Sequence, residues 1–262
     1  MNRIEAKFKE LKKKNKLAFI AFITAGYPGL EKTRKLVVEF ARRGVDIVEL
    51  GVPFSDPMAD GPIIQEASYR ALKKGVNIQK ILGTVRKIRL DTQIPICLMT
   101  YFNPIFCYGE QRFIKECKAT GVDGIIIPDL PLEEGRSLMR LARDNGVDVI
   151  CFVSPTTSFK RMCRIAKLSR GFIYYVSITG VTGARQNLPD GLLKKLKSLR
   201  ALTPKPVCVG FGVSSPRQVR LIQSRGAGVI VGSAIVKKIK SCLSDKDLVR
   251  KVSQYVSYLK NV

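Results

Sequence analysis

Eight apolar runs, separated by amphipathic stretches, predict a (β/α)8 barrel, the TIM-barrel class of α/β fold. The chain has 262 residues, a length that such barrels commonly reach as one domain, and 45% of them are hydrophobic. The sequence contains no linker rich in Pro, Gly or Ser and no low-complexity tract. We therefore expect residues 1–262 to form a single domain.

A helix-like stretch that ends in Gly and leads into an apolar run recurs along the chain. It reads ARRGVDIVELG at 41–51, KATGVDGIIIPD at 118–129 and RDNGVDVICFVS at 143–154, with a looser copy, QSRGAGVIVGSA, at 223–234. Each Gly suits the position after a helix, where φ is positive and a Cβ would clash. The nearly continuous apolar run that follows is typical of a strand buried on both faces. Helix-then-strand repetition therefore predicts a parallel sheet.

The order of the elements follows from these runs. The eight predicted strands are Leu17–Thr24, Ile47–Gly51, Ile96–Tyr101, Gly124–Asp129, Val149–Ser154, Phe172–Ser177, Val207–Gly212 and Gly228–Gly232. Apolar stripes at helical spacing predict helices over 31–43, 190–202 and about 245–259. Two connections are long, 52–62 after the second strand and 178–189 after the sixth. Both follow strand C-termini, where barrels carry their active sites, so we expect binding loops or lids.

Composition excludes several classes of chemistry. The chain has no histidine, so Ser-His-Asp and Cys-His mechanisms and histidine-ligated metals are excluded, and no metal site is expected. Acid–base chemistry must then use carboxylates, Tyr, Lys or Cys. The chain has seven cysteines, an odd number, and no two of them have CxxC spacing. This pattern indicates free, buried thiols in a reducing compartment.

Charge and hydropathy limit the classes of partner that the chain is expected to have. No apolar run reaches the roughly 18 residues of a membrane span, and residues 1–16 lack the pattern of a signal peptide. We therefore expect a cytoplasmic protein without a membrane partner. The net charge of +25 favours a polyanion partner in general, but the Lys and Arg residues are spread along the chain. We interpret them as a solvated surface and expect no nucleic-acid partner.

Small residues follow the last three predicted strands. They are Thr182-Gly183, Gly210-Phe211-Gly212 and Gly232-Ser233. Glycine lets bare backbone N–H groups approach an anion, and a helix start after Gly232-Ser233 would add its dipole and a hydroxyl. Barrels often bind phosphate after strands seven and eight. The alternative is that these glycines only form tight turns, but three such segments at consecutive strand ends favour a phosphate site.

Acidic side chains lie near the same end of the predicted barrel. Glu49 stands inside the apolar second strand, where a carboxylate is costly unless it has a partner or a task. Asp56 and Asp60 lie in the long loop that follows, and Asp129 ends the fourth strand. Tyr174, in the sixth strand, could bring a hydroxyl to the same place. The alternatives are a salt-bridged strand residue for Glu49 and turn chemistry for the two loop aspartates.

The longest of these segments carries a family resemblance. ELGVPFSDPMADGPIIQ, residues 49–65, resembles the signature of the tryptophan synthase alpha chain family. Six further segments agree in order, so that the resemblance runs from about residue 15 to residue 240. They are FITAGYPG (22–29), YFNPIFCYG (101–109), GVDGIIIPDLP (121–131), SITGVTGAR (177–185), VGFGVS (209–214) and VIVGSAIV (229–236).

The resemblance implies an activity and assigns roles. It implies a lyase that cleaves indole-3-glycerol phosphate by a retro-aldol reaction into indole and glyceraldehyde 3-phosphate. Its two catalytic carboxylates correspond to Glu49 and Asp60, and its active-site tyrosine to Tyr174. Asp56 corresponds to a residue that communicates with the partner subunit. The substrate-binding positions correspond to Phe22, Met99, Ile126, Thr182, Gly183, Phe211, Gly212, Gly232 and Ser233.

The resemblance also implies a partner and a mechanism. The partner is a beta chain in an alpha2-beta2 heterotetramer, which receives indole for tryptophan synthesis, and no cofactor is expected. Glu49 would act as acid at the indole carbon and as base at the side-chain hydroxyl, while Asp60 would accept the indole N–H bond. The alternatives are another phosphate-binding barrel such as a phosphosugar isomerase, a lyase that works alone, or an activator of the beta chain whose own turnover is impaired.

Overall fold

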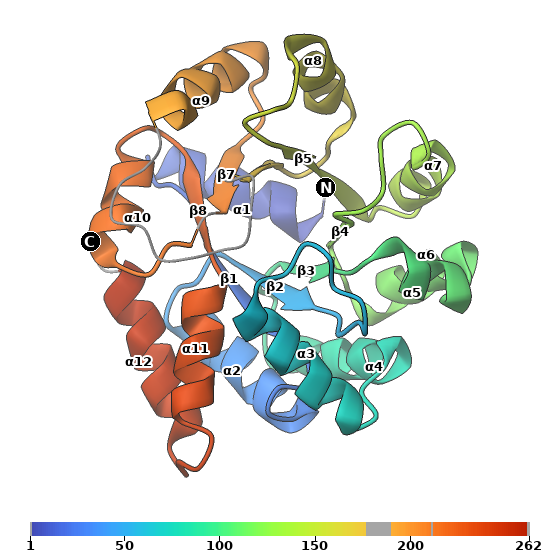
Figure 1. The fold of residues 1–262 in the computed structure, drawn as a ribbon, viewed down its shortest axis with the longest axis vertical. Helices are drawn as coiled ribbons and strands as arrows, with labels where there is room; N and C mark the ends of the chain where they lie inside the picture. Colours follow the sequence, from blue (N-terminus) through green and yellow to red (C-terminus); the bar gives the residue numbers. More distant parts are fainter. Residues whose placement is uncertain (1, 177–189, 211, 261–262) are drawn as a thin grey trace.

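Eight parallel strands close into a barrel in which each strand pairs with the next along the chain and β8 pairs with β1 (Figure 1). The computed structural model describes residues 2–176, 190–210 and 212–260, with only the backbone described at 190–193. The fold class predicted from the sequence is therefore confirmed. The strands are β1 (Phe19–Thr24), β2 (Ile47–Gly51), β3 (Ile96–Met99), β4 (Gly124–Ile126), β5 (Asp148–Val153), β6 (Ile173–Val176), β7 (Val207–Gly210) and β8 (Gly228–Val231).

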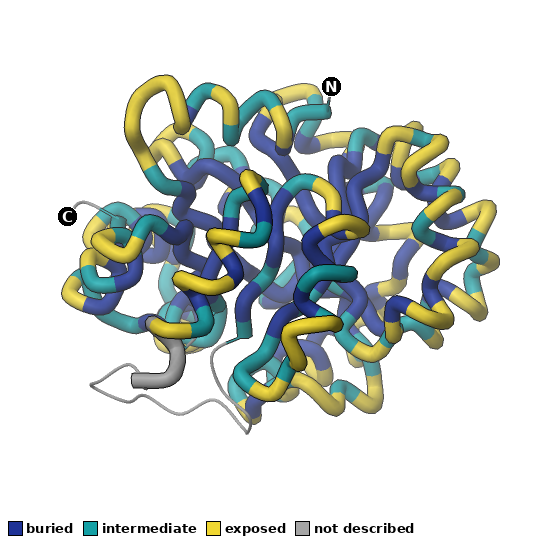
Figure 2. The backbone as a smooth tube through the Cα atoms, turned by 90° about the horizontal axis from the view of Figure 1, so that it is seen from above, coloured by how far each residue is buried: buried dark blue, intermediate teal, exposed yellow. Residues whose placement is uncertain are grey.

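Helices surround this barrel as an outer ring (Figure 1), and the exposed residues lie on the outward turns of that ring (Figure 2). Those after α1 are α2 (Leu30–Arg42), α3 (Pro62–Lys73), α4 (Ile78–Arg89), α5 (Phe102–Tyr108), α6 (Glu110–Thr120), α7 (Arg136–Asp144), α8 (Phe159–Leu168), α9 (Asp190–Leu202), α10 (Pro216–Gln223), α11 (Ser233–Ser241) and α12 (Leu248–Lys260). None of the helices within the described ranges has the length and apolar character needed to cross a membrane.

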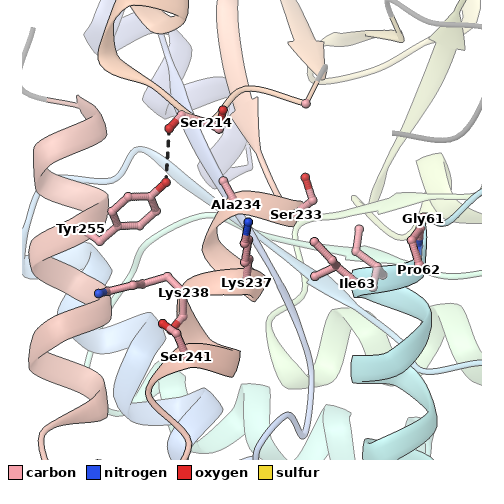
Figure 3. A pocket seen from close by; sticks show the side chains of 12 residues that line it. Gly61, Pro62, Ile63, Ser214, Ser233, Ala234, Lys237, Lys238, Ser241 and Tyr255 are labelled. Carbon is pink, nitrogen blue, oxygen red and sulfur yellow. Dashed lines mark hydrogen bonds between the residues drawn. The ribbon is translucent and has the colours of Figure 1, made fainter. Parts of the chain in front are cut away.

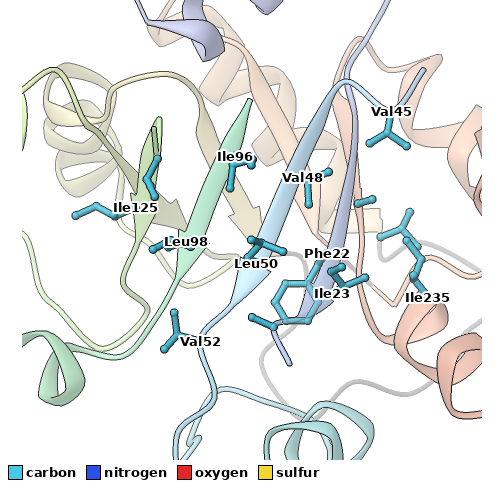
Figure 4. Close-up of a cluster of buried hydrophobic side chains, with 14 of the residues drawn as sticks. Phe22, Ile23, Val45, Val48, Leu50, Val52, Ile96, Leu98, Ile125 and Ile235 are labelled. Atoms are coloured by element: carbon cyan, nitrogen blue, oxygen red, sulfur yellow. The ribbon is translucent and has the colours of Figure 1, made fainter. Parts of the chain in front are cut away.

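Alternation along each strand divides the core into two layers. One face of each strand packs against the helices, as the close-up of Val48, Leu50, Ile96 and Leu98 shows (Figure 4). The other face fills the barrel, where Ile47 belongs to the inner cluster. Because Glu49 follows Ile47 by two positions, it lies on this inner face, nearer the C-terminal end of the barrel.

The first helix, α1 (Arg3–Lys13), covers the N-terminal end of the barrel. Its Ile4 and Leu11 pack with the inner cluster. Arg3 also holds it to the barrel through an ion pair with the buried Asp123, at 3.0 Å. The sequence did not predict this helix, because a charged, Lys-rich segment with few apolar residues does not show the usual wide stripe. The helix seals the barrel at the end opposite the long loop of residues 52–61.

Two of the three aspartates in the repeated Gly-Val-Asp segments, Asp46 and Asp123, join neighbouring strands. The Asp46 carboxylate accepts the backbone N–H of Phe19 at 2.8 Å, and that of Asp123 accepts the N–H of Ile96 at 2.9 Å. Each aspartate therefore joins the start of its own strand to the start of the preceding one. The glycines before these segments, and the one in the looser copy, have positive φ as predicted: Gly44, Gly121, Gly146 and Gly226.

Two other expectations needed correction. Most predicted strands extend past the observed ones at their C-terminal ends, because residues such as Thr100, Tyr101 and Ile127 stay buried after the backbone has left the sheet. All seven cysteines are free thiols, as predicted, but not all are buried. Cys107 is exposed and Cys163 is half-buried, since both lie on outer helices.

Candidate active site

Glu49 is a carboxyl group enclosed in the barrel. Its side chain is fully buried, and neither carboxylate oxygen has a hydrogen-bond partner among the described residues. It lies between Phe22 on β1 and Cys97 on β3 in the strand register. Burial, and secondarily the negative charge of Asp60, raise the pKa of Glu49 to about 8. A salt-bridged strand residue would have a cationic partner, and the structure gives Glu49 none within its described part.

Asp60 reaches the same region from the loop after β2. Burial raises its pKa to about 6, while a hydrogen bond from the hydroxyl of Tyr101 lowers it in part. The Tyr101 side chain is buried at the end of β3, and its oxygen also accepts the backbone N–H of Ala59 at 2.9 Å. The ring packs on Phe54 at 5.3 Å between centroids. Tyr101 therefore contacts the loop after β2 at Phe54 and again at Ala59, next to Asp60.

A cavity of about 330 Å³ opens at this end of the barrel. It has apolar walls and few polar groups, an environment that suits a flat aromatic ring with a polar tail. It is lined by Phe22, Ala59, Asp60, Gly61, Ile64, Met99, Pro128, Phe152, Ser154, Tyr174, Val176, Gly210, Gly212, Ile230, Gly232 and Ser233. Most of these residues lie at or just beyond strand C-termini, where the sequence predicted the site.

Two glycines make room for the aromatic walls. A Cβ on Gly210 would lie 2.4 Å from the Tyr174 ring, and a Cβ on Gly51 would lie 2.6 Å from the Phe22 ring. Tyr174 is on the inner face of β6, whereas Tyr175 packs on the helix side. Burial, and then the charges of Glu49 and Asp60, raise the pKa of Tyr174, so its hydroxyl stays protonated.

The predicted phosphate-binding residues gather at one side of the cavity. Gly212, Gly232 and Ser233 all line it, and Ser233 begins α11. The backbone N–H groups of the first turn of a helix lack partners within the helix and attract anions. Thr182, Gly183 and Phe211, the other predicted residues of this region, lie outside the described residues. The arrangement leaves space for a phosphate at the start of α11.

The remaining predicted residues have other positions. Ile126 is fully buried in the inner cluster and does not line the cavity. Asp56 is exposed in the loop after β2. The carboxylate of Asp129 accepts the backbone N–H of Phe102, at 2.9 and 3.1 Å from its two oxygens, and so caps α5. Within the described ranges, no three Cys, Asp or Glu side chains are grouped so that they could hold a metal ion.

Several residues of the site are not identified from the sequence, and two of them, Tyr101 and Phe152, make contacts that shape it. Tyr101 stood in the quoted segment YFNPIFCYG without a role, and Phe152 was only part of a predicted strand. The Phe152 ring packs on Tyr174 at 4.8 Å between centroids and extends the apolar wall. Phe152 could have been identified as a site residue, because it lies on the inward face of a strand that ends at the mouth of the barrel. For Tyr101 no local signal existed.

Comparison with known proteins identifies the family of this chain. The family model for the tryptophan synthase alpha chain matches residues 8–262. A tryptophan synthase alpha chain from Geotalea daltonii is 47% identical over 260 residues, covering 99% of this chain and 98% of that protein. The crystal structure of tryptophan synthase subunit alpha from Legionella pneumophila superposes with a TM-score of 0.91 at 35% identity, covering 100% of this chain and 98% of the other.

A second solved structure carries the name of an assembly. It belongs to the study of mutual activation in the tryptophan synthase α2β2 complex of Pyrococcus furiosus. The chain superposes on it with a TM-score of 0.87 at 36% identity, covering 94% of this chain and 98% of the other. The family model spans nearly all of the sequence, and the relatives agree with it over their whole length. The chain therefore belongs to the tryptophan synthase alpha chain family.

Proposed function

We propose that Glu49 and Asp60 catalyse the retro-aldol cleavage of indole-3-glycerol phosphate in the cavity described above, the reaction of the alpha chains of this family. The observation that carries the proposal is Glu49, a fully buried carboxyl group with no partner among the described residues and a pKa near neutrality. Such a group is costly to the fold and suited to proton transfer at neutral pH. A purely structural role would leave this cost without compensation.

Glu49 donates one proton to the substrate and accepts another from it in each catalytic cycle. It is protonated at pH 7 because its pKa lies at about 8, so it first donates a proton to C3 of the indole ring. The resulting carboxylate then accepts the proton of the adjacent side-chain hydroxyl. As that proton leaves, the hydroxyl carbon becomes the aldehyde carbon, and the electron pair of the C–C bond returns to the ring. Glu49 ends the cycle protonated, and the products are indole and glyceraldehyde 3-phosphate.

Asp60 acts on the other side of the ring. Its pKa of about 6 leaves it ionised at pH 7. Protonation of C3 places positive charge on the ring nitrogen, and a carboxylate that accepts the N–H bond stabilises that charge. The hydrogen bond from Tyr101 keeps Asp60 ionised and directs it into the cavity. The two carboxyl groups therefore have different protonation states at the same pH, as an acid and an electrostatic stabiliser require.

Different parts of the cavity wall contact the indole ring and the phosphate of the substrate. The apolar residues Phe22, Met99 and Phe152 surround the indole, and Tyr174 adds a ring and a neutral hydroxyl. The phosphate binds at Gly212, Gly232 and Ser233, where a helix start offers backbone donors. The family resemblance adds Thr182, Gly183 and Phe211 to this set. Ile126, one layer deeper, would support the floor of the site rather than contact the ring.

A beta chain is the proposed partner, in a cytoplasmic α2β2 assembly that receives the indole. The support is the similarity to the Pyrococcus furiosus chain, whose structure is titled as part of the α2β2 complex. Two apolar side chains are also exposed on the loop that carries Asp60 and on α5, namely Met58 and Phe106. The Phe54–Tyr101 ring contact joins this loop to the start of α5.

The test is an assay of indole release from indole-3-glycerol phosphate while purified beta chain is added in steps. We expect equal amounts of indole and glyceraldehyde 3-phosphate, with a rate that rises until the two chains are equimolar. Full activity without the beta chain would instead identify a lyase that works alone. Stimulation of the beta chain without any cleavage would identify an activator, and the absence of both effects would contradict the proposed function.

A further inference from the structure

A second cavity, of about 500 Å³, adjoins the active site (Figure 3). It lies between the start of α3, the segment after β7, and α11, and Tyr255 of α12 closes its far wall. The Tyr255 hydroxyl donates a hydrogen bond to the backbone oxygen of Ser214, at 3.3 Å. Four residues line both cavities, so the two spaces meet at the proposed phosphate position: Gly61, Ile64, Gly212 and Ser233.

The charge of this second cavity has one sign. Lys237 and Lys238 line it, and none of the described residues that line it is acidic. Within the described part of the chain, no ion pair or hydrogen bond engages either ammonium group. Lys240, one turn further along α11, differs because it pairs with Glu66. An ammonium group that faces a cavity without a carboxylate is free to meet an anionic ligand.

Lys237 is placed to reach the start of its own helix. It follows Ser233 by four positions, so both side chains lie on the same face of α11. Side chains in a helix point back toward its N-terminus, which carries the lysine over the turn that begins at Ser233. In Figure 3 the Lys237 ammonium points toward Ala234 and Ser233, whereas that of Lys238 extends toward α12.

We infer that Lys237 recognises the phosphate of the substrate through its charge and selects phosphorylated over unphosphorylated indole derivatives. This inference rests on the proposed function, because it places the phosphate at Gly212, Gly232 and Ser233. The backbone donors there fix the position of the phosphate. Among the described residues that line the two cavities, Lys237 is the cation on the same face of α11 as Ser233. Its role is substrate selection, and proton transfer at the indole does not depend on it.

The experiment measures the binding of two uncleavable probes, indole-3-propanol phosphate and indole-3-propanol, by calorimetry. Lys237→Met keeps the length and apolar stem of the side chain and removes the charge. We expect it to weaken binding of the phosphorylated probe roughly 3- to 10-fold, between the effect of an exposed ion pair and that of a buried charged hydrogen bond. Binding of indole-3-propanol should be unchanged. Lys237→Arg should retain most of the affinity.

Lys238→Met is the matched control, since it removes the neighbouring charge from the same cavity. It should change the Kd of the phosphorylated probe less than 2-fold, because the Lys238 ammonium group extends toward α12, away from the start of α11. The inference is overturned if Lys237→Met binds like the wild type, weakens both probes equally, or matches Lys238→Met. It is also overturned if the wild type does not distinguish the two probes. Failure of the proposed function is a separate result, because it shows as lack of indole release and these probes need no turnover.

Discussion

The protonation of Glu49 links catalysis to stability. In the unfolded chain this carboxyl group ionises near pH 4.5, whereas in the folded chain its pKa is about 8. Between these values the folded state holds a proton that the unfolded state has released. The free energy of unfolding therefore falls as pH rises through this window, and the cost is complete above about pH 8.

Glu49→Gln removes this cost and should be the more stable protein at alkaline pH. We expect a gain on the order of 2–5 kcal/mol at pH 9, shrinking to little at pH 5, in urea unfolding curves. Glu134→Gln is the control, since it makes the same substitution at an exposed position. A difference between Glu49→Gln and wild type that stayed constant from pH 5 to pH 9 would show that Glu49 is not buried as a neutral acid.

Tyr101 positions Asp60 and keeps it ionised, so Tyr101→Phe should alter the pH profile. Without the hydroxyl, the Asp60 pKa rises, and the acidic limb of kcat/KM moves to higher pH. We expect kcat/KM to fall roughly 10- to 100-fold at pH 7, the usual effect of losing a hydrogen bond to a charged group. Tyr108→Phe is the control, because that hydroxyl binds Glu116 on the outer helices. An unmoved acidic limb would rule out this role for Tyr101.

The two acidic residues were predictable to different degrees from the same sequence. Glu49 could be identified because a carboxylate in an apolar strand is unusual in itself. The environment of Asp60 could not, since Tyr101 contacts its segment across 42 positions of the chain. Likewise, nothing local to Asp129 separates a catalytic carboxylate from a helix cap, the role the structure gives it.

At the scale of elements, α4 contains a glycine that the fold does not need. A Cβ on Gly83 would meet nothing within 4 Å, and the residue lies in the helix interior. Gly83→Ala should therefore raise the free energy of unfolding by about 0.5–1 kcal/mol without changing indole release. Gly51→Ala is the contrast, because its Cβ would press on the Phe22 ring, and it should destabilise. A Gly83→Ala protein less stable than wild type would contradict this account of the helix.

Element ends were predicted well only where a residue type marks them. Helix ends before Gly44 and Gly121 follow from the need for positive φ, and the structure confirms both. Strand ends have no such marker. Tyr101 and Ile127 are buried and apolar enough to continue a strand pattern, although the backbone has already turned into the loops that form the site. The α1 seal depends on contacts such as Arg3 with Asp123, 120 positions apart.

At the scale of the whole molecule, the net charge of +25 should produce only weak, non-specific binding to nucleic acid. Some of the basic side chains pair with acids along single helices, as in Lys14–Glu10 and Arg43–Glu39. We expect a Kd for random duplex DNA of roughly 10⁻⁴ to 10⁻⁶ M at physiological salt, weakening steeply as salt is added. Fluorescence anisotropy with labelled duplexes measures it. Nanomolar, sequence-selective binding would show that the basic surface has a partner of its own.

Closure of the barrel brings Asp60 and the start of α11 to one cavity and places Glu49 beside Phe22, which lines that cavity. The central claim is that Glu49 transfers the proton of the reaction. The most direct test is the turnover of indole-3-glycerol phosphate by Glu49→Gln in the presence of the beta chain. General acid–base catalysis contributes about 10²- to 10⁴-fold, and Glu49 serves two transfers, so kcat should fall to the upper end of that range or beyond. Substrate binding, measured separately, should be nearly unchanged. Turnover near the wild-type rate would contradict the account and assign the proton transfer to another group.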